Sequence, residues 1–97
     1  MIVRVVKMVF QPAAIDAFEA LFRERKEQIR NMPGCTHLEL LRETQQGSTF
    51  FTYSFWEQEA DLEYYRHSDL FKDTWKKTKA LFAEKAQAWS LEQKHAL

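Results

Sequence analysis

The sequence predicts an α+β domain in which helices cover one face of an antiparallel β-sheet. Segments rich in β-branched residues alternate with amphipathic helical segments in the order β-α-β-β-α-β. A short loop that ends in glycine joins the two middle strands as a hairpin, which makes their pairing antiparallel. The chain has 97 residues, a length that supports a single domain over residues 1–97 with one modest core.

The first strand and the first helix have clear patterns. Residues 2–10 are IVRVVKMVF, and their β-branched side chains favour an extended conformation. Pro12 suits the first turn of a helix, and residues 13–31 follow with apolar side chains at steps of three and four. That apolar stripe contains Ile15, Phe18, Phe22 and Ile29. Pro33 and Gly34 end the helix, because proline lacks an amide proton and glycine accepts the turn conformation.

A β-hairpin follows. We expect strands at residues 35–43 and 48–57, joined by the loop TQQG at residues 44–47. With a four-residue loop, Cys35 lies opposite Trp56, and the pairing of every other residue follows from that register. One face then carries Leu38, Leu40, Phe51, Tyr53 and Phe55. The other carries Leu41, Phe50 and Trp56 around the polar residues His37, Glu39, Thr52 and Ser54.

Two helices and a strand complete the expected elements. We expect a short helix at residues 59–66 and a longer one at residues 69–84, with Ser68 as the N-cap of the second. The apolar stripe of the longer helix is Phe71, Trp75, Thr78, Leu81 and Phe82. Residues 86–93 form a fourth strand in this interpretation, and the alternative is a continuation of the helix. The order is that of the split βαβ, ferredoxin-like arrangement.

Helices on one face of the sheet leave the other face uncovered, and both faces carry large apolar side chains. Burying one such side chain is worth about 1.5–3 kcal/mol, so the sequence favours a second cover. We expect a second copy of the sheet to supply it, in a symmetric homodimer with a shared core. The alternative is that the C-terminal tail folds over this face.

Composition and charge exclude several classes of partner. Fourteen basic residues balance fourteen acidic ones, so no bulk field attracts nucleic acid or an anionic membrane. No apolar run approaches the roughly 20 residues that a membrane span needs. The single cysteine, Cys35, permits no internal disulfide, and we therefore expect a cytoplasmic protein.

The sequence contains no pattern typical of a metal or cofactor site. The histidines at positions 37, 67 and 95 form no i, i+4 pair and have no neighbouring set of cysteine ligands. With only two glycines, the chain has no glycine-rich loop for a nucleotide, and it lacks a GxSxG nucleophile motif. We expect neither a metal nor a bound cofactor.

Several short features together resemble the antibiotic biosynthesis monooxygenase (ABM) family. They are the Pro-led helix, the PGC turn at residues 33–35, the FWE end of the third strand at residues 55–57, Ala60, and Ser68 with Phe71 in the spacing S-x-x-F. The resemblance covers nearly the whole chain. It rests on the order and spacing of these features rather than on any single motif.

The resemblance implies a ferredoxin-like protomer that pairs into a dimeric α+β barrel, with a pocket between helices and sheet. It also implies either oxidation of phenolic or quinol-type aromatics by dioxygen without a bound cofactor, or degradation of heme. The heme-degrading branch places an asparagine, a tryptophan and a histidine at the positions of Lys7, Tyr65 and Trp75. None of the three is present, and the iron has no axial histidine, so the resemblance argues against heme degradation.

Three residues are candidates for catalysis. His37 lies in the middle of a strand and is a candidate general base for a phenolic proton; the alternative is a sheet or interface histidine. Tyr65 could donate a hydrogen bond to a substrate oxygen, or serve as a core residue. Lys7 could offer a cation to an anion, or extend its amine to solvent. The candidate substrate-pocket residues are Phe22, Tyr53, Ser54, Phe71 and Trp75, with core packing as the alternative for Phe22 and Trp75.

Two functions follow from these patterns. The first is a homodimeric, cofactor-independent monooxygenase that oxidises a small phenol- or quinol-type aromatic with dioxygen. The second is a non-catalytic dimeric barrel that binds a small molecule or acts in stress. Tyr65 and Ser54 favour the second, because the family tends to have a histidine and an acidic residue at these positions.

Overall fold

The computed structural model describes residues 1–97 and confirms the predicted order of elements. Its strands are β1 (Ile2–Val9), β2 (Cys35–Arg42), β3 (Thr49–Trp56) and β4 (Gln87–Glu92). Its helices are the 3₁₀ turn η1 (Pro12–Ala14), α1 (Ile15–Arg30), α2 (Glu59–Arg66) and α3 (Asp69–Lys79). The result is a ferredoxin-like α+β fold.

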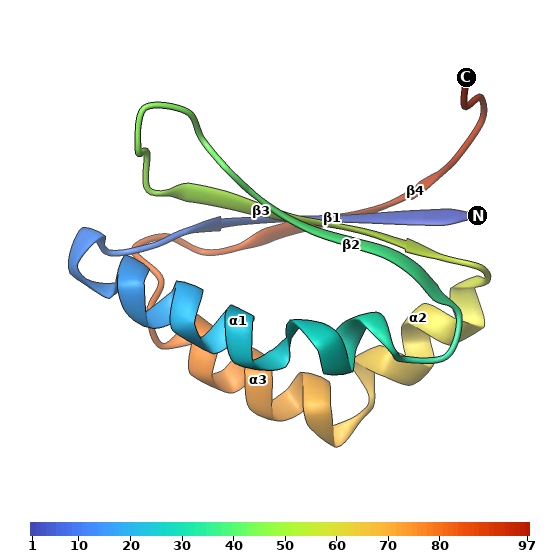
Figure 1. Ribbon diagram of the computed structural model, residues 1–97, viewed down its shortest axis with the longest axis horizontal. Coiled ribbons are helices and arrows are strands. Elements are labelled where there is room, and N and C mark those ends of the chain that lie inside the picture. The colour runs from blue at the N-terminus through green and yellow to red at the C-terminus, as the bar shows by residue number, and fades with distance from the viewer.

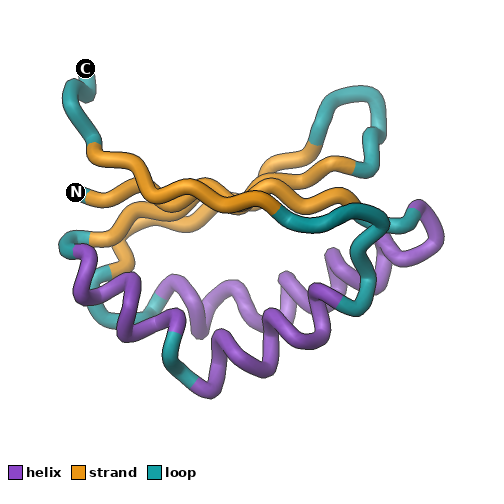
Figure 2. The backbone as a smooth tube through the Cα atoms, turned by 180° about the vertical axis from the view of Figure 1, so that it is seen from behind, coloured by secondary structure: helices purple, strands orange, loops and turns teal.

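The four strands form one antiparallel sheet in the order β2-β3-β1-β4. All three α-helices lie against the same face of this sheet, as Figure 1 and the reverse view in Figure 2 show. The opposite face has no helix over it. The chain beyond Glu92 extends away from the sheet, so the alternative in which the C-terminal tail covers this face is wrong.

The prediction of a long helix over residues 69–84 is wrong at its C-terminal end, because α3 stops at Lys79. The chain then turns back to the end of β1. The amide of Ala83 donates to the carbonyl of Val9 at 2.8 Å, and Phe10 and Phe82 form an isolated antiparallel bridge. Backbone pairing with the end of the first strand therefore overrides the helical periodicity of the residues that follow Lys79.

The predicted register of the β2–β3 hairpin is also wrong, by one residue. His37 lies opposite Phe55 and Leu38 opposite Ser54, whereas a four-residue loop would pair His37 with Ser54. Only the predicted pair of Cys35 with Trp56 is confirmed, because an irregularity between Cys35 and His37 restores that register at the end of the strand.

This shift changes which side chains share a face, since one residue of slip moves a side chain to the other side of the sheet. Leu38 and Leu40 of β2 now lie with Thr52 and Ser54 of β3 on the helix side. The open face carries His37, Glu39, Leu41, Phe51, Tyr53 and Phe55, together with Trp89 and Leu91 of β4.

Two buried clusters attach the helices to the sheet. The larger contains Met8, Phe10, Ile15, Phe18 and Phe50, and the rings of Phe10 and Phe18 stack with centroids 4.1 Å apart. The smaller contains Cys35, Trp56 and Leu62 beneath α2. Gly34, at φ +81°, lets the preceding turn approach α2 closely, because a Cβ there would collide with the carboxylate of Asp61.

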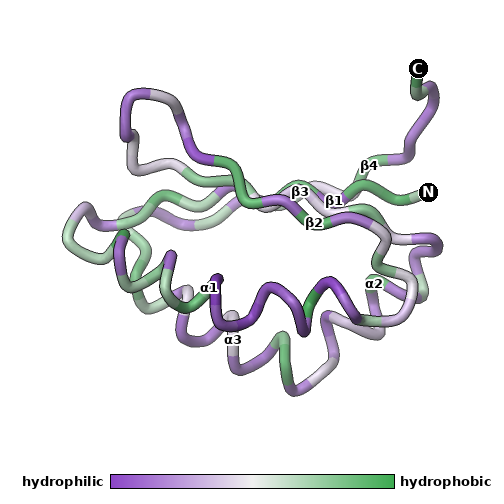
Figure 3. Tube along the Cα trace, in the orientation of Figure 1, coloured by the Kyte–Doolittle hydropathy of each residue, from purple (hydrophilic) through white to green (hydrophobic).

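The open face remains partly apolar and accessible in the single chain. Leu41, Trp89 and Leu91 are each between 43% and 48% exposed. Figure 3 shows hydrophobic residues along all four strands, whereas hydrophilic residues predominate along α1. None of the helices combines the length and the apolar character that crossing a bilayer requires.

Candidate active site

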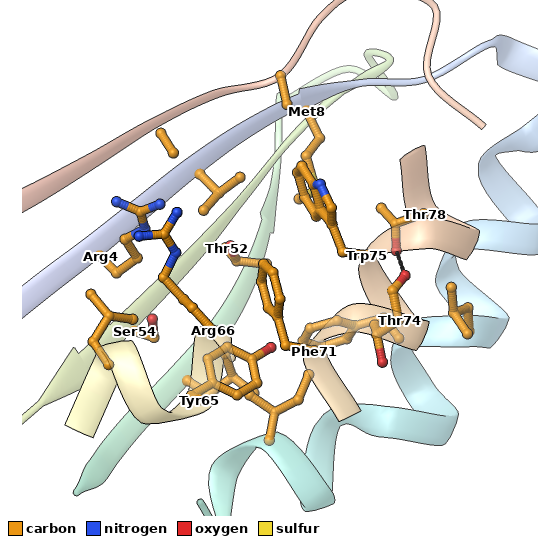
Figure 4. Close-up of a pocket in the computed structure, with 18 of the residues that line it drawn as sticks. Arg4, Met8, Thr52, Ser54, Tyr65, Arg66, Phe71, Thr74, Trp75 and Thr78 are labelled. Carbon is orange, nitrogen blue, oxygen red and sulfur yellow. Dashed lines mark hydrogen bonds between the residues drawn. The ribbon is translucent and has the colours of Figure 1, made fainter. Parts of the chain in front are cut away.

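A cavity of about 310 Å³ lies between the sheet and the helices. All four strands and all three α-helices contribute to its wall, and 14 of its 21 lining residues are hydrophobic. A concave and mostly apolar site with a few polar groups is typical of small-molecule binding. Figure 4 shows this cavity with its principal side chains.

A continuous row of aromatic rings forms one wall. Tyr65 stacks on Trp56 with centroids 5.1 Å apart, and Phe71 meets the edge of Tyr65 at 5.2 Å. Phe71 and Trp75 are nearly parallel, with centroids 5.9 Å apart and an interplanar angle of 9°. Ser68 caps α3 by accepting a hydrogen bond from the amide of Phe71 at 3.1 Å, which confirms its predicted role as N-cap. The cap satisfies an otherwise unpaired amide in the first turn of the helix that carries Phe71 and Trp75.

Tyr65 supplies a hydroxyl to this aromatic wall, and Figure 4 shows its ring beside Phe71. Burial raises the pKa of Tyr65 well above its ordinary value of 10.0, with a smaller contribution from the nearby Cys35 thiol. The hydroxyl therefore stays protonated at neutral pH. Tyr65 lines the cavity, and a phenolic O–H is a hydrogen-bond donor, so Tyr65 can donate to a ligand there.

Ser54 is buried at the sheet side of the cavity. Its Oγ accepts a hydrogen bond from Nε1 of Trp56 at 3.0 Å. The indole thus occupies the acceptor side of the hydroxyl, and the hydroxyl proton remains available to donate. Ser54 is therefore a second neutral donor in the cavity.

Arg4 of β1 and Arg66 of α2 provide the only charged side chains of the lining. Neither residue was among the sequence-based candidates. The alternation of side chains along β1 could have identified Arg4 as a cavity residue, because Arg4 shares its side of the strand with the inward-facing Val6 and Met8. The position of Arg66 depends on how α2 docks and could not be read from a motif.

The structure separates the residues that the sequence selected into two groups. The cavity lining includes Phe22, Ser54, Tyr65, Phe71 and Trp75. Three other candidates, His37, Tyr53 and Lys7, lie on the open face of the sheet. There His37 contacts the Glu39 carboxylate, and its ring lies 4.9 Å from that of Phe55.

The position predicted for His37, beside Ser54, is therefore wrong: the two residues are on opposite faces of the sheet. No imidazole, carboxylate or amine is present in the cavity lining. The cavity offers hydroxyl donors, guanidinium groups and aromatic surface, and it has no side chain that could act as a general base at neutral pH. A catalytic role for His37 would need a site on the open face.

The fold is an α+β sheet with helices on one face and a cavity with an aromatic wall between the two layers. The antibiotic biosynthesis monooxygenase family model matches residues 1–77. The chain therefore belongs to the antibiotic biosynthesis monooxygenase family. A search of curated proteins finds no significant match.

Solved structures reproduce the whole fold. A crystal structure of an antibiotic biosynthesis monooxygenase superposes with a TM-score of 0.90 at 20% identity, covering 98% of this chain and 100% of that one. A conserved protein from Methanosarcina mazei Go1 gives 0.89 at 20% identity, with 97% and 94% covered. A mutant of SnoaB, a cofactor-independent oxygenase from Streptomyces nogalater, gives 0.85 at 17% identity, with 99% and 95% covered. At these identities the likeness establishes the fold alone.

Proposed function

We propose that this protein is a monooxygenase that oxidises a small phenol- or quinol-type aromatic with dioxygen and without a bound cofactor. The observation that carries the proposal is the aromatic-walled cavity in which Tyr65 presents a protonated hydroxyl. Membership of the family supports the reaction class. The fold shared with SnoaB, which is a cofactor-independent oxygenase, supports the absence of a cofactor.

The substrate itself supplies the electrons in this reaction. A phenol that has a free para C–H bond loses its phenolic proton to water, and the electron-rich anion reacts with dioxygen at the para carbon. Loss of water from the resulting hydroperoxide leaves a carbonyl at that carbon. One oxygen atom enters the product, the other leaves as water with the two hydrogens, and no external reductant is required.

The cavity contributes orientation and electrostatic stabilisation to this chemistry. The parallel rings of Phe71 and Trp75 form a flat surface against which a planar substrate packs. The hydroxyl groups of Tyr65 and Ser54 donate to the oxyanion that forms in the reaction, in a mostly apolar cavity. Neither residue acts as the base in this scheme.

The proposed assembly is a homodimer in which two open sheet faces pack together. The support is the apolar surface that the single chain leaves accessible, including the rings of Phe51, Tyr53 and Phe55 and the exposed Trp89. Two such faces related by a twofold axis would bury each other and form a barrel-like shared core. In this assembly Lys7 and His37 contribute to the interface.

Oxygen uptake tests the proposed activity. The purified protein is assayed with a panel of naphthols and hydroquinones, and the uptake is compared with that of protein-free solutions. We expect at least one compound with a free para position to be consumed at a rate proportional to protein concentration. No protein-dependent uptake with any compound would contradict the proposal.

The second candidate function is binding of a small aromatic molecule without turnover. The absence of an imidazole or carboxylate from the cavity lining favours it. Calorimetry separates the two functions, because a binding protein would retain affinity for aromatic ligands while consuming no oxygen in their presence.

A further inference from the structure

Two arginines occupy one end of the cavity, and they come from different layers of the fold. Arg4 extends from β1, and Arg66 from the last turn of α2. Figure 4 shows the two guanidinium groups beside one another, at the opposite end of the cavity from Thr78. Nη1 of Arg4 donates to Oγ of Ser90 at 2.9 Å, and Nη1 of Arg66 donates to Oε1 of Glu63 at 3.0 Å.

The charges at this end do not balance. Arg66 has an ion pair with Glu63, but Arg4 forms none, and its one hydrogen-bond partner is the neutral Ser90 hydroxyl. Partial burial and the neighbouring Arg66 both lower the pKa of Arg4, while Glu63 opposes them. Two cations and one carboxylate leave an excess positive charge, because a guanidinium stays protonated in proteins.

Two positive charges held close together repel each other, and a bound anion would relieve this repulsion. Each guanidinium has five N–H donors in a planar fork that matches the two oxygens of a carboxylate. Only one of these donors of Arg4 has a partner among the side chains of the chain. The remaining donors provide a docking point for an oxyanion.

The shape of the rest of the cavity defines what carries that oxyanion. The wall that starts near Arg66 is the row of rings from Tyr65 through Phe71 to Trp75. This wall favours a flat apolar body, and a body of two fused rings is compatible with a cavity of about 310 Å³. We infer that the ligand of this cavity is an aromatic carboxylate whose carboxylate binds Arg4 and Arg66 while its rings pack against Phe71 and Trp75.

This inference rests on the proposed function for the identity of the cavity as the substrate site, and it narrows the substrate class to acidic aromatics. Its structural alternative is that Arg4 only ties β1 to β4 through Ser90. The two readings differ in their consequences. A tie between strands affects stability, whereas a carboxylate site produces selectivity between charged and neutral ligands of one shape.

Isothermal titration calorimetry with two probes of equal shape tests the inference. The probes are 2-naphthoate, which carries a carboxylate at pH 7.5, and 2-naphthamide, which is neutral. We expect 2-naphthoate to bind at least about tenfold more tightly, since one charge-assisted hydrogen bond contributes on that scale. The preference should shrink as sodium chloride is added, because part of it is electrostatic.

Three variants test whether the preference for 2-naphthoate over 2-naphthamide depends on the two arginines. Arg4→Gln and Arg66→Gln should each reduce the affinity for 2-naphthoate about tenfold and leave that for 2-naphthamide unchanged. The matched control is Arg23→Gln, which removes one positive charge from an exposed position on α1 outside the cavity. It should retain the wild-type preference.

Equal affinity for the two probes in the wild type, or no binding of either, would overturn the inference. Equal losses for both probes in Arg4→Gln would assign Arg4 a structural role only and would also overturn it. The result is independent of oxidation, because neither probe is a substrate for oxygenation. Selective binding of 2-naphthoate without oxygen uptake on any phenol would support the carboxylate site and contradict the monooxygenase proposal. Oxygen uptake without selective binding would support the monooxygenase proposal and contradict the carboxylate site.

Discussion

Tyr65 of α2 stacks on Trp56 of β3, with ring centroids 5.1 Å apart and an interplanar angle of 19°. Trp56 is fully buried and also donates to Ser54, so one indole positions both hydroxyl donors of the cavity. The stack fixes the phenol ring of Tyr65 on the cavity wall. Its hydroxyl is thereby oriented before a ligand arrives, which is the arrangement that electrostatic catalysis requires.

Replacing Tyr65 with phenylalanine should reduce turnover and leave the fold intact. Removing one preorganised donor to a developing oxyanion typically lowers kcat by about 10²-fold. The substitution keeps the ring and its stack on Trp56, so the free energy of unfolding should change by less than about 1 kcal/mol. Steady-state kinetics and urea denaturation of Tyr65→Phe measure the two effects. Tyr64→Phe, at a neighbouring position that is 63% exposed, is the matched control, and equal losses in both variants would contradict a role for Tyr65.

The stability of the protein at high pH should also depend on Tyr65. Its pKa in the folded state is raised above the 10.0 of an accessible tyrosine. Below pH 10 the residue is neutral in both states, and this contribution to stability is complete. Above pH 10 the unfolded chain ionises first, so the contribution falls as pH rises toward the folded-state pKa. Urea denaturation between pH 8 and about 11 should show a shallower decline for Tyr65→Phe, and identical curves would contradict this account.

Local sequence patterns were sufficient to predict most of the fold. Periodicity of two and of 3.6 residues located the strands and helices, and Ser68 was identified as a cap from its residue type and position. The aromatic stripe of Phe71 and Trp75 correctly predicted a surface that faces the sheet. The end of α3 could not be predicted, because contacts of Ala83 and Phe82 with β1 override helix propensity.

The division of the site residues between two faces could not be predicted, because it depends on the hairpin loop and the bulge. Gln45 and Gln46 both adopt positive φ values, of 63° and 58°, a conformation that sequence rules assign to glycine or asparagine. Thr36 is the extra residue between Cys35 and His37. The loop shifts the register by one residue and so places His37 opposite Phe55 on the open face, and the bulge at Thr36 reverses the shift so that Cys35 still pairs with Trp56.

A charge on the open face should prevent the proposed dimer. Tyr53 lies in the open face on β3, where its ring clusters with those of His37 and Phe55. Tyr53→Arg would place two arginines, one from each protomer, in the apolar interface, where unpaired charge is strongly unfavourable. Light scattering should give twice the monomer mass for the wild type and the monomer mass for the variant.

The control for this experiment is Tyr64→Arg, which introduces the same side chain on the exposed side of α2. It should remain dimeric. A wild-type protein that is monomeric at micromolar concentration would rule out the proposed assembly and leave the open face without an explanation.

His37→Ala should leave turnover in the cavity unchanged to within about twofold, since the sheet separates His37 from the cavity lining. The same variant should weaken the dimer, because the contact between His37 and Glu39 lies on the open face. Kinetics at saturating protein concentration, where the dimer is maintained, separate the two effects. A large loss of kcat under those conditions would instead place the chemistry on the open face and restore His37 as the candidate base.

The most direct test of the central claim is the stoichiometry of oxygen uptake with a phenol that the protein consumes, measured with and without catalase. Monooxygenation predicts one dioxygen consumed for each phenol converted to a quinone, with no change when catalase is added. Return of half of the oxygen on addition of catalase would show that dioxygen is reduced to hydrogen peroxide and that none of its atoms enters the product. That result would contradict the assignment of this cavity as an oxygenase site.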